Sequence, residues 1–234
     1  MDHKEGLIVG RNAVLQALES GRTIDSVTVA QGQRGGQAGR IKFADQRRLD
    51  RLCDGAAHQG VAAFAAAHEY AEMDDIFALA ESRNESPFIV VCDSLEDPHN
   101  LGAILRSAEA AGVHGVIIPK RNSVTLNYTV AKTSAGAIEY VPVVKVANLP
   151  AAIDELKSRG VWIFGADMDG TDYTALDYSG SIALVIGSEG KGIGRLVREK
   201  CDFIASLPMR GKINSLNASV AAGILMFEAA KHRN

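Results

Sequence analysis

The chain has 234 residues, 47% of them hydrophobic, and a formal net charge of −3. This composition predicts a globular protein with one large core or two smaller ones, and the net charge argues against a uniformly basic nucleic-acid-coating surface. No apolar run approaches the roughly 18 residues that span a bilayer, and the first residues lack a signal-peptide profile. We therefore expect a cytoplasmic protein with no membrane partner.

The three cysteines, Cys53, Cys92 and Cys201, are widely spaced and never form a Cys-x-x-Cys pair. Their odd number and their scatter argue against a disulfide framework and against a structural zinc site. We therefore expect reduced, mostly buried thiols and no metal.

The N-terminal part, residues 1–84, is predicted to form a small α/β domain. Strands are expected at Ser26–Ala30 and Gly60–Phe64, although the alanine-rich sequence of the second does not by itself separate strand from helix. A helix is expected from about Phe43 to Cys53, after a loop rich in Gly and Gln over 31–39.

An amphipathic helix is expected over Met73–Ala80, and the polar segment Glu81–Pro87 follows it. A polar segment that ends in proline and precedes a new apolar run is typical of a domain boundary. We therefore expect one domain over 1–84 and a second over 85–234.

Basic residues are concentrated between Gln31 and Arg51, where six residues are Lys or Arg and only two are Asp or Glu. Because the whole chain is slightly acidic, any contact with nucleic acid must be local, and this stretch is a candidate for it. The same pattern also fits a solvated loop and helix face. The candidate residues are Arg34, Arg40, Arg47 and Arg48.

From residue 87 onward, short apolar runs alternate with helical segments. The runs are FIVVC, GVIIP, VPVVKV, VWIFGA, IALVIG and FIASLP. Continuously apolar runs predict strands that are covered on both faces, and hence an α/β domain with a mostly parallel sheet. Ligands of such sheets bind at the carboxyl ends of the strands, so functional residues are expected just after each run.

The first polar strand end is the segment Asp93–Gly102. Asn100 is placed to cap a helix that runs to about Ala111, and capping alone would explain it. Arg106 lies about one and a half turns further along that helix. A long, positively charged side chain there could be a surface residue or could bind a phosphate, and the helical pattern fits both.

The second strand end is the sequence GSEGKGIG over 187–194. Its glycines allow a ligand to approach the backbone closely. It contains neither the GxGxxG fingerprint nor a GK[ST] phosphate loop, which argues against a nicotinamide-dependent oxidoreductase and against P-loop chemistry. Glu189 is expected to be functional, because a carboxylate among glycines loses solvation unless it is paired or needed.

The third strand end runs from Pro208 to Asn217 and precedes the apolar helix sequence ASVAAGILMFEAAK. Ser215 and Asn217 both stand at the start of this helix, where one of them is sufficient as a cap. The helix has small residues beside large apolar ones, which suits it to close packing against another helix. That helix could belong to a second subunit.

Three segments together resemble, in order, the three motifs of the SpoU, or TrmH-like, branch of the SPOUT RNA 2′-O-ribose methyltransferases. They are DPHNLGAILRSAEAAGVHGVIIP, ALVIGSEGKGIGRLVREKCD and SLPMRGKINSLNASVAAGILMFEAAK, and the match spans Phe88–Lys231. Upstream, GRNAVLQAL and HQGVAAF are similar to the small substrate-binding domain of members that modify 23S ribosomal RNA, which has an L30e-like ribosomal-protein fold.

The resemblance implies a C-terminal trefoil knot, a homodimer formed through the knotted region, and S-adenosylmethionine as the methyl donor. The knot is a topology that general rules of chain connection would reject. The positions that match the family's donor-binding segments are Ile186, Gly187, Leu207, Pro208, Met209 and Leu216. Those that match its catalytic positions are Asn100, Arg106, Glu189, Ser215 and Asn217.

The implied reaction is methylation of a ribose 2′-oxygen in RNA, with a guanosine of 23S ribosomal RNA expected as the substrate. Transfer RNA is an alternative substrate, and a non-catalytic RNA-binding protein is an alternative function. Arg106 is expected to engage a phosphate, and Arg11 with the basic stretch to contact the RNA backbone. The proton acceptor stays open, because guanidinium remains protonated in proteins; Glu189 either fixes Arg106 or accepts the proton through water.

Overall fold

The computed structural model describes residues 6–19, 24–31, 41–65 and 68–233. The N-terminal part forms a four-stranded sheet of order β1-β4-β2-β3, in which β4 is antiparallel to both neighbours and β3 is parallel to β2. Small apolar clusters around Leu49 and Val14 pack against it. Its elements are β1 (Leu7–Val9), α1 (Arg11–Glu19), β2 (Ile24–Ala30), β3 (Ile41–Ala44), α2 (Gln46–Leu52) and β4 (Val61–Ala65).

The C-terminal part forms a six-stranded sheet of order β10-β8-β9-β5-β6-β7, in which all neighbouring strands are parallel. This confirms the expected α/β fold with a mostly parallel sheet. Its strands are β5 (Phe88–Cys92), β6 (Gly115–Pro119), β7 (Val143–Val146), β8 (Trp162–Asp172), β9 (Ile182–Ile186) and β10 (Phe203–Ser206). Its helices are α3 (Met73–Ser82), α4 (Pro98–Ala110), α5 (Tyr128–Thr133), η1 (Ala137–Glu139), α6 (Leu149–Ser158), η2 (Tyr173–Ala175), α7 (Arg195–Arg198) and α8 (Ala218–Ala230).

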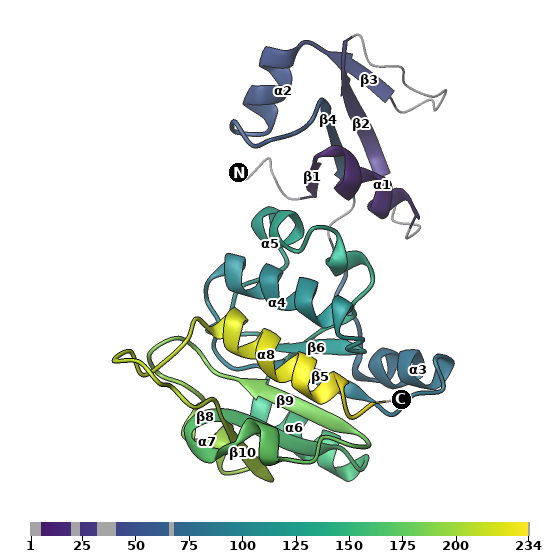
Figure 1. The fold of residues 1–234 in the computed structure, drawn as a ribbon. Helices are drawn as coiled ribbons and strands as arrows, with labels where there is room; N and C mark the ends of the chain where they lie inside the picture. Colours follow the sequence, from purple (N-terminus) through teal and green to yellow (C-terminus); the bar gives the residue numbers. More distant parts are fainter. Residues whose placement is uncertain (1–5, 20–23, 32–40, 66–67, 234) are drawn as a thin grey trace.

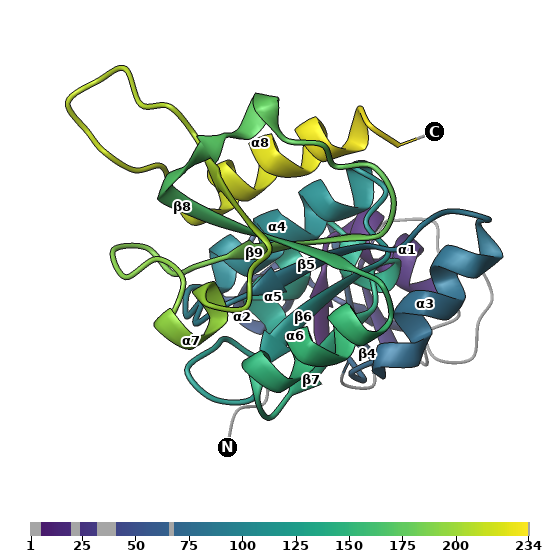
Figure 2. The same cartoon turned by 90° about the horizontal axis from the view of Figure 1, so that it is seen from below.

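Helices cover this sheet on both faces, which explains why its central strands are continuously apolar. On β5, Phe88 and Val90 enter the core beneath α4 and α8, whereas Ile89 and Val91 enter the core beneath α3, α6 and α7. Figures 1 and 2 show the two helical layers on opposite sides of the strands. No helix among the described residues has the length and apolar character that crossing a membrane requires.

Helix α3 packs on the C-terminal sheet. The Ile76 side chain is fully buried, in the same cluster as Ile89 and Val91, and a Cβ added to Gly115 of β6 would lie 2.4 Å from it. Ala71, just before α3, forms an isolated bridge with Val144 of β7. The division at residues 84 and 85 stays a prediction, while the packing assigns α3 to the core of the larger sheet.

The helix expected from about Phe43 to Cys53 is shorter in the structure and begins after a strand. Phe43 pairs with Val29 as part of β3, and the helix starts only after Asp45, whose carboxylate accepts from the Arg48 N–H at 2.8 Å. The prediction was wrong at this end because pairing with β2 determines the conformation of residues 41–44. The strands expected at Ser26–Ala30 and Gly60–Phe64 are found as β2 and β4.

Asn100 does not cap α4, contrary to the expectation. The helix begins two residues earlier at Pro98, whose fixed φ suits a first helical turn, and Asp97 caps it by accepting from the His99 N–H at 2.8 Å. Asn100 is therefore inside the helix, and its buried side chain is free to bond elsewhere. The expected end is correct, since Gly112 follows α4 with a φ of +77°.

The two sheets meet through α5. Tyr128, at the start of α5, packs against the N-terminal cluster that contains Leu7 and Leu49. The other end of α5 presses on α4, because a Cβ added to Gly102 would lie 1.8 Å from the Thr133 hydroxyl. The helix α4, which carries Asn100, is thus linked to the N-terminal domain through α5, which packs on both (Figure 1).

Replacing Ile76 by alanine tests the assignment of α3 to the larger core. The Ile76→Ala variant is expected to lose about 2–5 kcal/mol of unfolding free energy, because it leaves a cavity in a fully buried cluster. Chemical denaturation measures this loss. The half-buried Leu79 of the same helix provides the control, and a loss in Leu79→Ala as large as that in Ile76→Ala would contradict the assignment.

Candidate active site at the carboxyl edge of the sheet

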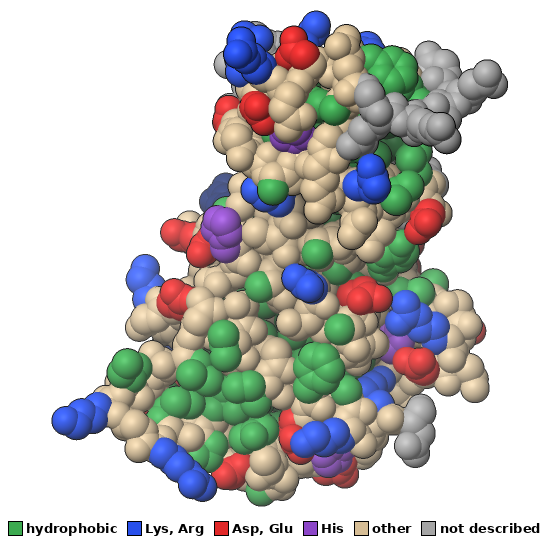
Figure 3. Space-filling view, turned by 45° about the horizontal axis from the view of Figure 1, so that its top comes forward, with side chains coloured by type: hydrophobic (Ala, Val, Ile, Leu, Met, Phe, Trp, Pro, Cys, Tyr) green, Lys and Arg blue, Asp and Glu red, His purple; other side chains and the backbone are tan. Residues whose placement is uncertain are grey.

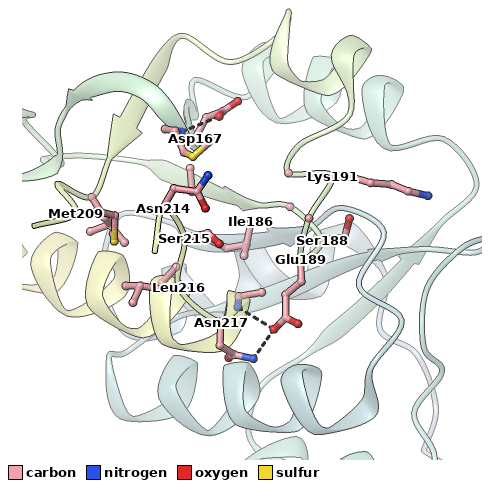
Figure 4. A pocket seen from close by; sticks show the side chains of 18 of the residues that line it. Asp167, Ile186, Ser188, Glu189, Lys191, Met209, Asn214, Ser215, Leu216 and Asn217 are labelled. Atoms are coloured by element: carbon pink, nitrogen blue, oxygen red, sulfur yellow. Dashed lines mark hydrogen bonds between the residues drawn. The ribbon is translucent and has the colours of Figure 1, made fainter. Parts of the chain in front are cut away.

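Three segments that carry predicted catalytic residues meet at the carboxyl edge of the sheet. The loop after β5 leads to Asn100, the loop after β9 contains Glu189, and the segment after β10 leads to Asn217. The first two loops are neighbours because β5 and β9 pair in parallel, with Cys92 opposite Ile186. The third crosses to the start of α8, beside Glu189 (Figure 4).

The Glu189 carboxylate is the centre of a hydrogen-bond network. Its Oε1 atom accepts from the Asn100 side-chain amide at 3.2 Å, from the Ala218 backbone N–H at 3.3 Å and from the Asn217 side-chain amide. Asn217 Nδ2 also donates to Asn100 Oδ1 at 2.9 Å. The carboxylate is therefore paired within the protein, and the network joins residues 117 positions apart.

Asn217 has a second role as the cap of α8. Its Oδ1 atom accepts from the backbone N–H groups of Ser219 at 3.0 Å and Val220 at 3.3 Å, while its Nδ2 atom faces Glu189. The sequence left open which of Ser215 and Asn217 caps this helix, and the structure selects Asn217. Ser215 remains available to line the neighbouring cavity.

The glycine-rich loop is closed on itself and tied to β5. The N–H of Ser188 donates to the carbonyl of Gly192 at 3.1 Å, and the reverse bond is 2.9 Å long. A Cβ on Gly187 would lie 2.1 Å from the Gly192 carbonyl carbon, so only glycine fits there. The buried Asp93 carboxylate accepts from the Gly194 N–H at 2.7 Å, which fixes the end of the loop.

A cavity of about 560 Å³ opens beside this loop, and we call it the first cavity. Its size falls within the about 300–1,000 Å³ that is typical of small-molecule sites. Figure 4 shows Leu216 and Met209 on one side and the glycine loop on the other. Predicted site residues that line it are Ile186, Gly187, Glu189, Leu207, Met209, Ser215, Leu216 and Asn217.

A second cavity of about 450 Å³ lies across Glu189 from the first. Ser188, Glu189 and Lys191 line both cavities. Asn100 lines only the second cavity. The Glu189 loop is thus a wall between two hollows, and the Lys191 side chain points away from Ser215 and Leu216 in Figure 4.

Other predicted residues lie outside these cavities. Arg106 is exposed on α4 and lines neither cavity, and within the described residues no hydrogen bond joins it to Glu189. Pro208 also lines neither. The remaining candidates belong to the N-terminal domain: Arg11, Arg47 and Arg48 are exposed on its helices, whereas Arg34 and Arg40 lie outside the described residues.

The sequence reasoning missed the contribution of β8. Ala166, Asp167 and Met168 line the first cavity. Ala166 is the last residue of the apolar run VWIFGA, and Asp167 and Met168 directly follow it, although β8 itself continues to Asp172. The expectation of functional residues just after each apolar run would have found Asp167 and Met168. Asp167 is anchored by Arg198, whose guanidinium donates to it at 2.8 Å.

The lining of the first cavity suits a ligand that has both an apolar surface and hydrogen-bonding groups. Apolar side chains and backbone groups of the glycine loop form most of its lining. Cys92, at the end of β5, is no nucleophile, since burial and the nearby Asp93 raise the pKa of its thiol to about 12. Among the described residues, no three His, Cys, Asp or Glu side chains gather as metal ligands.

Variants of Asn217 separate its two roles. Asn217→Ala is expected to lower the unfolding free energy by about 1 kcal/mol, because α8 loses its cap. Asn217→Ser keeps a capping oxygen but cannot reach Glu189, so it should recover most of that stability. Equilibrium denaturation compares the two variants, and equal losses would show that capping is not what Asn217 contributes.

Comparisons with known proteins agree with this arrangement. The family model of the SpoU rRNA Methylase family matches residues 87–227, and that of the RNA 2′-O ribose methyltransferase substrate-binding domain matches residues 7–71. A Bacillus subtilis protein, YacO, which is assigned by name to the TrmH family of tRNA/rRNA methyltransferases, is 48% identical, with 100% of this chain and 98% of that protein covered.

Solved structures share the fold. The AdoMet-bound rRNA methyltransferase from Sinorhizobium meliloti is 25% identical with a TM-score of 0.80, and the similarity covers 97% of this chain and 87% of that one. The TrmH/SpoU tRNA modifying enzyme from A. aeolicus is 29% identical with a TM-score of 0.56, covering 68% of this chain and 82% of that one. The match to the family model, together with the near full-length relative, shows that the chain belongs to the SpoU rRNA methylase family.

Proposed function

We propose that this protein transfers a methyl group from S-adenosylmethionine to the 2′-oxygen of a ribose in RNA, most specifically of a guanosine in 23S ribosomal RNA. The observation that carries the proposal is the Asn100–Glu189–Asn217 network, which stands between a cavity that fits the donor and a second cavity open to a substrate. Family membership supplies the reaction class.

The first cavity fits the proposed donor. Leu207, Met209 and Leu216 offer apolar surface for an adenine ring, and the glycine loop offers backbone groups for hydrogen bonds. Glu189 places a carboxylate at the wall, which favours the positive charge of a sulfonium. When bound, the donor supplies a methyl group on a sulfur that is already a good leaving group. The Sinorhizobium meliloti relative, named as AdoMet-bound, supports this assignment.

Glu189 is the proton acceptor that the geometry supports best. A ribose hydroxyl is a weak nucleophile, so a neighbouring group must orient it and take its proton. All three donors to the Glu189 carboxylate converge on Oε1, and Oε2 has no partner among the described residues. The network therefore holds the carboxylate in one orientation with one oxygen free to accept from a hydroxyl or a bridging water. The sequence left two roles open for Glu189, which were to fix Arg106 or to accept the proton. We propose that it accepts the proton.

Arg106 is proposed to bind the phosphate of the target nucleotide. Its side chain is exposed, and the next residue, Ser107, faces Gly223 of α8, where an added Cβ would lie 3.7 Å from the Ser107 hydroxyl. Arg106 therefore projects from the helix that packs against α8. A guanidinium at this position can hold a phosphate by paired hydrogen bonds.

The outer face of α8 supports the proposed homodimer. Val220, Ile224 and Phe227 recur at helical spacing on it and are 49%, 36% and 50% exposed. In Figure 3 hydrophobic side chains gather on the lower part of the molecule, which is formed by the C-terminal domain. An exposed apolar patch of this kind is typical of a subunit contact.

The proposed trefoil knot and the L30e-like fold of the N-terminal domain follow from family membership. Contacts that bind the glycine loop to β5 through Asp93 and to α8 through Glu189 are consistent with a chain that passes close to itself in this region. The match of residues 7–71 to the substrate-binding model supports a role for the N-terminal domain in binding RNA.

The share of this chain that aligns with each solved enzyme favours ribosomal RNA over transfer RNA as the substrate. The ribosomal-RNA enzyme from Sinorhizobium meliloti aligns with 97% of this chain, whereas the tRNA-modifying enzyme from A. aeolicus aligns with 68%. The difference corresponds in size to the N-terminal domain. Transfer RNA remains the second candidate, because the name of the Bacillus subtilis relative includes both RNAs.

Methyl transfer to unmodified total RNA tests the proposed reaction, with mass spectrometry locating the new 2′-O-methyl groups. Glu189→Gln is expected to slow transfer by about 10²–10⁴-fold, as loss of a general base does, and Arg106→Ala to abolish it. In calorimetry Arg106→Ala should bind the donor as the wild type does, whereas Glu189→Gln should still bind it but more weakly, because it lacks the carboxylate that favours the sulfonium. Near-normal turnover of either variant would refute its assigned role, and failure of the wild type to bind the donor would favour a non-catalytic RNA-binding protein.

The basic helix α2 tests the role of the N-terminal domain. The double variant Arg47→Ala, Arg48→Ala removes two exposed cations and should weaken RNA binding while reducing the salt dependence of the affinity by a slope of about 2. Donor binding should be unchanged. Filter binding at several salt concentrations measures the slope, and an unchanged slope would mean that this surface is only a solvated helix face.

A further inference from the structure

We propose that the second cavity holds the base of the target nucleotide and that Glu96 is the residue that selects guanine. The inference rests on the proposed function, because it assigns the acceptor side of that reaction. The second cavity is formed by loops that follow three adjacent strands, β5, β6 and β9. The lining residues are Ser94, Leu95, Glu96, Asp97, Asn100, Asn122, Ser188, Glu189 and Lys191.

The position of this cavity suits an acceptor nucleotide. Glu189 forms part of both cavities, so a nucleoside with its base in the second cavity places its ribose against Glu189, opposite the proposed donor. The loop after β6 is anchored to the cavity wall, because the Val124 N–H donates to the Leu95 carbonyl at 2.9 Å. The hollow is therefore a built part of the fold and not a gap between loose loops.

The charges on the cavity wall decide which part of a nucleotide enters. Glu96, Asp97 and Glu189 bring three carboxylates, and Lys191 brings the one cation among its lining residues. A phosphate would be repelled by this wall, whereas a group rich in N–H donors would be attracted. The base, and not the phosphate, is the part of RNA that such a wall accepts.

Cations for the phosphates stand just outside. Lys120 and Arg121 are exposed, directly precede Asn122 in the loop after β6, and have no side-chain partner among the described residues. They can hold backbone phosphates on either side of an extruded nucleotide. An acidic interior with a basic rim therefore suits a nucleotide whose base enters the cavity while its phosphates stay outside.

Glu96 is the free acceptor in this cavity. Asp97 uses one oxygen to cap α4, and Glu189 is held by its three donors. Glu96 is exposed, and no described residue donates to its carboxylate. It is therefore the wall carboxylate that a ligand meets with both oxygens available.

Guanine is the base that such a carboxylate recognises. Its Watson–Crick edge presents the ring N1–H and the exocyclic amine side by side, and one carboxylate can accept from both. Uracil presents a single N–H between two carbonyl oxygens, which a carboxylate repels. Adenine and cytosine each place an acceptor nitrogen beside their amine, so that only one of the carboxylate oxygens is matched.

The test compares wild type, Glu96→Gln and the control Glu109→Gln, which changes an exposed carboxylate further along α4. Each protein is incubated with S-adenosylmethionine and unmodified total RNA, and the digested RNA is analysed for the four 2′-O-methylnucleosides. Wild type and Glu109→Gln should form 2′-O-methylguanosine. Glu96→Gln should form it roughly tenfold more slowly, because a neutral amide replaces a charge-assisted acceptor, while donor binding in calorimetry stays unchanged.

Two outcomes overturn the assignment. One is a Glu96→Gln variant that makes 2′-O-methylguanosine at the wild-type rate, and the other is a wild-type enzyme whose product is a 2′-O-methylnucleoside other than 2′-O-methylguanosine. In both cases a ribose 2′-oxygen is still methylated, so the proposed reaction survives, although the second outcome removes guanosine as its substrate. Donor binding without any methyl transfer by the wild type would instead refute the proposed function, and the inference with it.

Discussion

The pairing of the Glu189 carboxylate is the interaction on which the arrangement of the site depends. Glu189 is an exposed residue, and hydrogen bonds from two helices hold its carboxylate in place. The donors come from α4 through Asn100 and from the start of α8 through Asn217 and Ala218. Because these elements are far apart in the sequence, the network forms only when the sheet and both helices are in place.

The parallel sheet makes this convergence possible. Adjacent parallel strands bring their carboxyl ends to one edge, where the loops after β5 and β9 face each other. The Glu189 loop then separates two cavities of different character, one largely apolar and one lined by carboxylates. If these are the donor and acceptor sites, as proposed, the shared wall would let one side chain orient a substrate against a bound donor without any large movement.

The N-terminal domain is connected to this site through a short chain of packed elements. Its core receives Tyr128 at one end of α5, and Thr133 at the other end contacts α4 at Gly102, two residues from Asn100. The close approach at Gly102 leaves no room for a side chain, so α4 and α5 have a fixed separation. RNA held by the N-terminal domain would therefore be held at a defined place relative to Glu189.

The sequence by itself determined the parallel α/β domain, the apolar helix that begins at Ala218 and the strand ends at which polar residues collect, because apolar periodicity and turn chemistry are local signals. It could not identify the cap of α4, since Asp97 and Asn100 are both good capping residues and only Asn100 has a distant partner. It also could not show that Arg106 lies away from both cavities, or that Glu96 faces the second one. Those facts depend on which loops become neighbours, and long-range strand pairing alone decides that.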